Sequence, residues 1–353
     1  MNTCPKCYRD NPSKANFCMN CGTKLISSDD LFAENAKIKR QFLAMQSDNL
    51  LSKKIIEDNT DAHTIFYGSI KKMEHEWIDQ NAISHEFANG FGIIKLDDEV
   101  TEIEDLVFHD CEQLYFITIP NGITAIKKFV ISFCKIKSIF IPSSVTQIAE
   151  YAFSSCDKLI SIAVDKRNKV YDSRDNCNAI IETATNTLIK GCVNTIIPDS
   201  VTKIGAGALG SNEDLMTISI PNSITEIGES AFSFCENLTA IEIPDSVTEI
   251  GRGAFMSCSS LKTILIPNSI KVINDDTFKD CVNLETVIIP KSVTEIGNNA
   301  FVYCKNLRHI EIPHTVTKIG DLAFALCNNL DEETKDMIRL INYQAFYEDD
   351  LPF

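Results

Sequence analysis

The sequence predicts a repeat solenoid made mostly of short β-strands, and two observations support that prediction. A unit of about 23 residues recurs between residues 94 and 330. Each unit places apolar residues, a proline and then an aromatic or aliphatic residue at the same positions. A fixed period of this size is typical of solenoids, whose repeats stack on one another. The prolines that mark the units are Pro120, Pro142, Pro198, Pro221, Pro244, Pro267, Pro290 and Pro313.

The unit at residues 238–258 shows why the repeats must stack. Its L-x-x-I-x-I run alternates as a short strand does, and Pro244 ends that strand because proline has no N–H for the ladder. The V-T-x-I run that follows predicts a second strand, and an Ala-Phe pair lies on a third side. One coil cannot bury these side chains, whereas coils stacked about 4.8 Å apart bury them in columns. We therefore expect Phe232, Phe255 and Phe278 to lie one above another.

The repeat pattern L-x-x-I-x-I-P-x-S-V-T-x-I-G-x-x-A-F-x-x-C resembles that of the BspA-type leucine-rich repeat family. The resemblance covers about two thirds of the chain, and we assign the leucine-rich repeat solenoid to residues 93–330. Departures are local: Asp97 stands in place of the first proline, and Asn212 in place of a cysteine. The family implies an interaction protein with no shared catalytic residues. We therefore expect a protein partner and no enzymatic activity.

Two Cys-x-x-Cys pairs lie within residues 1–25, namely Cys4 with Cys7 and Cys18 with Cys21. Each pair lets two thiolates bind one metal from a tight turn, and zinc is the usual ion for four sulfurs. The segment resembles the short zinc-ribbon domain at the N-terminus of many bacterial proteins. We expect one structural Zn²⁺, because four thiolates leave no coordination position for a substrate. The segment has few apolar residues, so we expect it to fold only with its metal.

Residues 26–92 are predicted to be helical. Residues 27–46, a short segment from Ser47 and residues 69–89 each carry apolar side chains near helical spacing after a capping residue. These helices form either a small linker unit or a cap over the N-terminal end of the solenoid, which otherwise exposes its apolar columns. Residues 331–353 are predicted to form a C-terminal helical cap. Its packing residues are expected to be Met337, Leu340 and Ile341.

The period is interrupted at residues 165–193. Alternating apolar residues around Ile180 and again around Leu188, separated by T-A-T-N, predict a β-hairpin. The interruption is therefore interpreted as an elaborated coil. Its basic residues belong to a solvated loop or, alternatively, to a partner contact. They are Lys166, Arg167, Lys169 and Arg174.

Eight cysteines recur at one position of the repeat. Stacked coils would bring their Cα atoms close enough for disulfides, but parallel stacking points their Cβ bonds in the same direction. We expect reduced thiols that fill a turn, where Asn212 can substitute, rather than a metal ladder or a redox relay. The column consists of Cys111, Cys134, Cys156, Cys235, Cys258, Cys281, Cys304 and Cys327.

The alternation of the first strand predicts which side chains point outward. These are the residues two and four places before each proline, and several are apolar where solvent is expected. Such a strip marks an interaction surface, although β-propensity alone would also place apolar residues there. Both readings stay open. The candidate partner surface comprises Phe116, Phe140, Ile196, Glu242, Leu265, Ile288, His309 and Glu311.

Composition limits the remaining classes of function. The chain has 353 residues, 44% of them hydrophobic, and a net charge of −16. Strong acidity argues against broad binding to nucleic acid or to anionic membranes, although residues 1–25 carry a net charge of +3 and leave nucleic-acid contact through the ribbon as an alternative. No run of 18 apolar residues predicts a membrane span. We see no secretion signal, and we expect a cytoplasmic monomer, with the cell surface as the alternative location.

Overall fold

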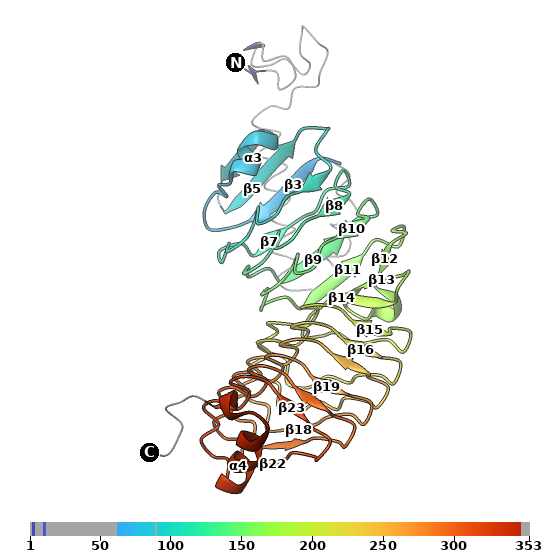
Figure 1. Cartoon of the computed structure of the whole chain (residues 1–353). Coiled ribbons are helices and arrows are strands. Elements are labelled where there is room, and N and C mark those ends of the chain that lie inside the picture. The colour runs from blue at the N-terminus through green and yellow to red at the C-terminus, as the bar shows by residue number, and fades with distance from the viewer. Residues whose placement is uncertain (1, 4–9, 12–61, 89, 347–353) are drawn as a thin grey trace.

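The computed structural model describes residues 2–3, 10–11, 62–88 and 90–346. Most of the chain is a curved stack of coils that runs from the N-terminal to the C-terminal end of the molecule (Figure 1). Corresponding residues of neighbouring coils pair in register, so that Thr263 lies opposite Thr286 and Thr286 opposite His309. These steps of 23 residues are the period of the sequence, and the predicted solenoid is confirmed.

Each coil has three sides. The strand that precedes the proline belongs to the side that we call the first sheet. Parallel pairs join β9 to β11, and β18 to β20 to β22. A single bridge between Ser219 and Glu242 continues this side through the middle coils. The strands are β7 (Phe116–Ile117), β9 (Ser138–Ile141), β11 (Ser161–Val164), β18 (Thr263–Leu265), β20 (Thr286–Ile288) and β22 (His309–Glu311).

The V-T-x-I run forms the second sheet, whose strands are two residues long and also parallel. Its side chains alternate as the sequence predicts, with the isoleucine of each pair pointing inward. The strands are β6 (Glu102–Ile103), β8 (Ala125–Ile126), β10 (Gln147–Ile148), β15 (Lys203–Ile204), β16 (Glu226–Ile227), β17 (Glu249–Ile250), β19 (Val272–Ile273), β21 (Glu295–Ile296) and β23 (Lys318–Ile319).

The third side is a series of turns that are also hydrogen-bonded from coil to coil. The amide of Phe255 donates to the carbonyl of Thr277 at 3.0 Å, and the amide of Phe278 to that of Ala300 at 2.8 Å. Behind these turns the phenylalanine rings form a buried stack. Ring centroids lie 5.3 Å apart between Phe232 and Phe255 and 5.6 Å apart between Phe255 and Phe278. The predicted column is therefore present.

The interruption contains the predicted hairpin. Strand β13 (Ala179–Glu182) pairs antiparallel with β14 (Thr187–Gly191), and β12 (Tyr171–Asp172) pairs antiparallel with β13. A short 3₁₀ turn, η1 (Arg174–Asn176), joins β12 to β13. Strand β14 then pairs in parallel with β15, so the hairpin supplies the second-sheet strand of its coil.

The third side of this coil is short. Ile197, which precedes a repeat proline, lies nine residues after Leu188. In the next coil the equivalent residue, Ile220, lies sixteen residues after Ile204, the register partner of Leu188. The buried residues accordingly form two clusters that meet here, one running from Ile65 to Cys192 and the other from Cys177 to Phe346.

The N-terminal cap is built differently from the prediction. Strands β4 (Ala82–Ala88), β5 (Phe91–Leu96), β3 (Thr64–Gly68) and β7 form one sheet in that order, with antiparallel pairing. Only α3 (Glu76–Asn81) is helical within residues 69–89. The predicted helix is therefore wrong over 82–88, where side chains alternate between half-buried and exposed, as in an edge strand. The helices predicted at residues 27–46 and from Ser47 lie outside the described residues.

The C-terminal end is covered by α4 (Glu332–Ile341) and by the 3₁₀ turn η2 (Tyr343–Ala345). Asp331 caps α4 by accepting the amide of Thr334 at 2.8 Å. Ile338 and Phe346 are the buried packing residues, and the amide of Phe324 donates to the carbonyl of Ala345 at 2.9 Å. Of the three predicted packing residues, Ile341 is partly buried against the core. The predictions for Met337 and Leu340 are wrong, because these side chains are 37% and 88% exposed.

Candidate interaction face and metal-binding segment

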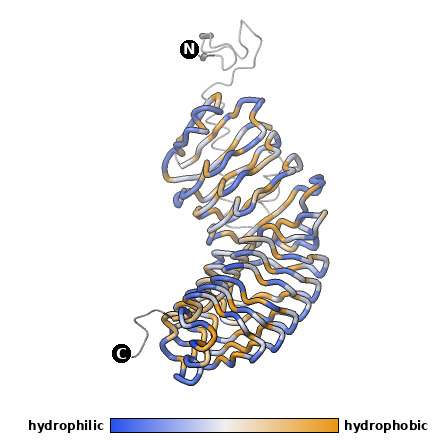
Figure 2. Tube along the Cα trace, in the orientation of Figure 1, coloured by the Kyte–Doolittle hydropathy of each residue, from blue (hydrophilic) through white to orange (hydrophobic). Residues whose placement is uncertain are grey.

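An apolar pair marks the outer face of the first sheet. Leu265 and Ile288 are register partners on β18 and β20, and they are 58% and 51% exposed. The residue before each of them, Ile264 or Val287, is buried. Because side chains alternate along a strand, this pattern fixes Leu265 and Ile288 outside the core. The alternation of apolar and polar residues along the coils is visible in Figure 2.

Polar residues surround this pair. Ile288 is the register partner of Glu311, and His309 lies on the same strand, with both side chains exposed. Glu242 lies at the equivalent position of the coil that precedes the Leu265 coil, and its side chain is also exposed. An apolar centre with a polar rim is the composition of a protein-binding surface. The backbone is already paired within the sheet, so contacts here would be made through side chains.

The other residues of the predicted partner surface differ in how far they are exposed to solvent. Ile196 is 74% exposed, whereas Phe140 is half-buried. Phe116 is only 6% exposed, and its assignment to the exposed strip is wrong because β3 of the cap pairs alongside it, with Gly68 opposite Phe116. Sequence reasoning missed Met216, which is 62% exposed. Met216 directly follows the buried Leu215 and lies before the alternating part of the strand, so alternation counted back from the proline does not identify it.

The cysteine column is structural within the described residues. Its thiols form no disulfides. All of them except Cys111 donate to a backbone carbonyl of the previous coil, whereas Cys111 donates to His109 of its own coil. Cys258 donates to Phe232 at 3.2 Å, and Cys281 donates to Phe255 at 3.2 Å. Burial raises the pKa of Cys281 to about 12. Asn212 fills the same place by donating to the carbonyl of Leu209 at 2.6 Å.

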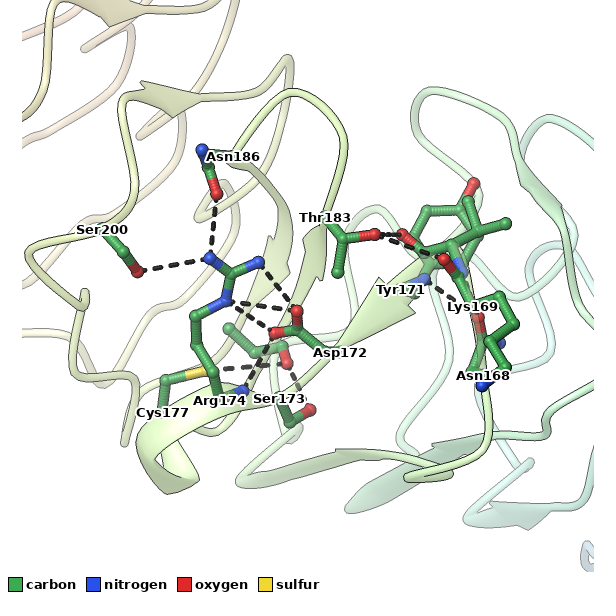
Figure 3. Close-up of polar contacts among 12 residues, drawn as sticks. Asn168, Lys169, Tyr171, Asp172, Ser173, Arg174, Cys177, Thr183, Asn186 and Ser200 are labelled. Atoms are coloured by element: carbon green, nitrogen blue, oxygen red, sulfur yellow. Dashed lines mark hydrogen bonds and ion pairs between the residues drawn. The ribbon is translucent and has the colours of Figure 1, made fainter.

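The two arginines of the insertion are engaged with nearby residues of the protein. Arg174 contacts Asp172 through two nitrogens, at 2.9 and 2.7 Å, and donates to Asn186 at 2.8 Å and to Ser200 at 3.3 Å (Figure 3). Arg167 pairs with Asp165 at 2.6 Å. These contacts favour the solvated, self-paired loop over a partner contact for the two arginines.

A buried amine lies at the junction of the two cores. Lys190 is 4% exposed and donates to the carbonyl of Gly210 at 3.4 Å. Burial lowers the pKa of Lys190, because desolvation disfavours the ammonium form. An adjoining cavity, lined by Tyr151 and Ser154 among others, has a volume of about 10 Å³. This is about the space that one water molecule needs, so the cavity is too small for a small-molecule ligand.

The four predicted zinc ligands, Cys4, Cys7, Cys18 and Cys21, lie outside the described residues. Two short described strands, β1 (Asn2–Thr3) and β2 (Asp10–Asn11), pair antiparallel on either side of the first Cys-x-x-Cys pair. Elsewhere in the described chain, no group of three or more His, Cys, Asp or Glu residues could hold a metal. Within the same residues, no helix has the length and apolar character needed to span a membrane.

Two protein families match the sequence. The BspA-type leucine-rich repeat region matches residues 84–190, 185–308 and 294–351, in six copies. A zinc-ribbon domain matches residues 3–25. A comparison with curated proteins gave no match.

Two solved structures share the fold. A leucine-rich cell surface protein from Faecalibacterium prausnitzii is 34% identical with a TM-score of 0.56, over 61% of this chain and 58% of that one. A leucine-rich repeat protein from Eubacterium ventriosum is 25% identical with a TM-score of 0.54, over 66% of this chain and 69% of that one. The match therefore spans less than two thirds of the length of the first of these proteins.

Proposed function

Because the chain belongs to the BspA-type leucine-rich repeat proteins, we propose that it is a non-enzymatic scaffold that binds a protein partner through its first sheet. The observation that carries this proposal is the exposed pair Leu265 and Ile288, set among polar residues. Apolar side chains held outward by strand alternation gain by being covered. The column thiols, all buried except the half-buried Cys111, are bonded to backbone carbonyls, so they support packing rather than chemistry.

The first sheet is tested by placing charge on the apolar pair. Leu265→Glu with Ile288→Glu should reduce recovery of the partner about tenfold or more, since covering unpaired carboxylates costs several kcal/mol. A control with the same added charge is Ala184→Glu with Asn222→Glu, because both residues are exposed away from β18 and β20. Quantitative mass spectrometry of cross-linked complexes from the native cell provides the measurement. Equal recovery with both double variants would contradict the proposal.

For the N-terminal segment we propose one structural zinc ion bound by Cys4, Cys7, Cys18 and Cys21. The family match over residues 3–25 and the pairing of β1 with β2 around the first cysteine pair support it. Zinc supplies a fixed tetrahedral crosslink to a segment that has few apolar residues to bury.

We place the protein in the cytoplasm, which suits its many free thiols. The relative from F. prausnitzii is a cell surface protein, which favours a surface adhesin as the second candidate. Protease treatment of intact cells separates the two. Release of solenoid peptides would identify the adhesin, and protection until lysis would identify the cytoplasmic scaffold.

A further inference from the structure

The third side of every coil except the one with the short third side uses left-handed backbone at two positions, four residues apart. The first precedes the buried Ala-Phe pair, as Ser230 does with a φ of 52°, and the second precedes the cysteine, as Ser257 does with a φ of 59°. This region disfavours large side chains and suits glycine, asparagine, aspartate and serine. The middle and later coils mostly follow that preference, with Gly207, Gly253 and Asn299 at the first position.

The early coils depart from it. Phe129 and Tyr151 occupy the first position with φ values of 55° and 61°, and Phe133 occupies the second with 54°. Small or short polar residues fill most of the equivalent places in the later coils, with Phe234, Tyr303, Leu322 and Leu326 as the exceptions, so the turn itself does not require aromatic side chains. Strain retained where a relaxed alternative exists is characteristic of functional positions.

These rings form a continuous array with His109, which we call the aromatic patch. Phe129 and Tyr151 stack with centroids 5.7 Å apart. His109 meets Phe129 edge-on at 6.4 Å and Phe133 at 5.3 Å, and its ring nitrogen is fixed by Ser132 at 2.7 Å. Phe133 is 50% exposed. The patch therefore offers an ordered aromatic surface to solvent.

A later coil shows what such a ring can hold. Tyr303 occupies the same second position as Phe133, and the ammonium of Lys305 lies 4.1 Å from the centroid of its ring. The lysine equivalent to Lys305 in the Phe133 coil is Lys135. It is turned away, because it pairs with Asp157 at 2.9 Å. Within the described residues, the cation–ring contacts do not include Phe133.

The charges around the patch favour a cation. Lys127 and Lys135 are both held in ion pairs, with Glu102 at 2.8 Å and with Asp157 at 2.9 Å. Lys128 is exposed, and it takes part in none of the ion pairs of the described residues. The same turns carry five exposed carboxylates against this one lysine: Glu104, Asp105, Asp110, Glu112 and Glu150.

We propose that the aromatic patch binds a lysine or arginine side chain from a basic segment of a partner protein, in the way that Tyr303 holds Lys305. Cation–π contact beside carboxylates suits a basic peptide and disfavours an acidic one. The patch lies on the third side of the early coils and is separate from the first-sheet face, so either proposal can fail without the other.

The test is fluorescence anisotropy with a labelled peptide of alternating arginine and glycine, using the full-length chain. The variants Phe133→Ser and Phe129→Asn place at these sites residues that the chain itself uses at Ser257 and Asn299. Each should weaken binding about tenfold, while the melting temperature stays constant or rises. The matched control is Tyr303→Ser, whose ring is already covered by Lys305, and its peptide affinity should be unchanged.

The acidic chain attracts any polycation at low salt, so the comparison is made at physiological ionic strength, where the Debye length is about 8 Å. Equal affinities for the wild type, Phe133→Ser and Phe129→Asn would overturn the proposal. It would also be overturned if Tyr303→Ser lost as much affinity as the patch variants. Binding of a glutamate–glycine peptide or a neutral oligosaccharide, in place of the basic peptide, would assign the patch to another partner.

Discussion

Lys190 is an amine enclosed at the junction of the two cores, with one backbone carbonyl as its hydrogen-bond partner. Its folded-state pKa lies below the value of about 10.4 expected in the unfolded chain. Between these two pKa values the unfolded state binds more protons, so stability rises with pH across that interval. At neutral pH the buried amine is therefore a source of instability.

Replacing Lys190 with methionine should stabilise the protein at neutral pH by about 1–3 kcal/mol. The difference should shrink as the pH rises to and beyond about 10.4, because only above that value is the amine neutral in the unfolded state as well as in the folded state. Urea unfolding at a series of pH values measures it, with Lys137→Met as an exposed control. A stabilisation that does not change with pH would contradict this account of Lys190.

Two phenylalanines of one coil should respond oppositely to truncation. Phe232 is fully buried in the ring stack, and Phe232→Ala should lower the free energy of unfolding by about 3–5 kcal/mol. Phe234 is 44% exposed with a φ of 58°, so Phe234→Ser should leave stability within about 0.5 kcal/mol or raise it. Chemical denaturation of both variants gives the comparison. A similar loss of stability in both variants would show that the Phe234 ring also contributes packing, despite the left-handed backbone at that residue.

The inward and outward side chains of single strands could be predicted from sequence, as Leu265 and Ile288 show. Phe116 could not, because its burial depends on β3, a strand about fifty residues earlier that no local pattern connects to it. The aromatic patch was missed for another reason. Alternation identifies strand faces, whereas Phe129 and Phe133 lie in turns with left-handed backbone.

At the scale of elements, the cysteine column predicts unreactive thiols. Only the thiolate attacks an alkylating reagent, and burial raises the pKa of Cys235 and Cys281 to about 12. Native protein at neutral pH should therefore leave both unlabelled, and both should react once the chain is unfolded. Peptide mass spectrometry after timed alkylation provides the measurement. Fast labelling of either residue in the folded protein would show that the coils open locally or that the column is exposed.

Element type was predictable where the pattern was repeated and less so where it occurred once. The hairpin of β13 and β14 was anticipated because its alternation is interrupted by a clear turn. Residues 82–88 were misassigned because the apolar residues of this region fit helical spacing and strand alternation equally, and pairing with β5 decides the outcome for Ala82–Ala88. Tertiary pairing of this kind overrides local propensity.

At the scale of the whole molecule, the core of the described residues begins at Ile65 and continues to Phe346. If zinc organises residues 1–25 alone, removing the metal should leave the solenoid intact. The fold of the repeats is maintained by stacking between neighbouring coils. The ribbon and the solenoid should thus respond separately to chelation.

Purified protein should contain about one zinc per chain, because four thiolates complete one tetrahedral site. Chelation should make Cys4, Cys7, Cys18 and Cys21 reactive while shifting the melting temperature of the solenoid by no more than about 2 °C. Cys4→Ser should abolish zinc binding, whereas Cys111→Ser, at a half-buried position of the column, should retain it. Elemental analysis and thermal unfolding followed by circular dichroism test both parts. A large loss of melting temperature on chelation would mean that the ribbon packs on the repeats, since metal binding can stabilise only the structure to which it is coupled.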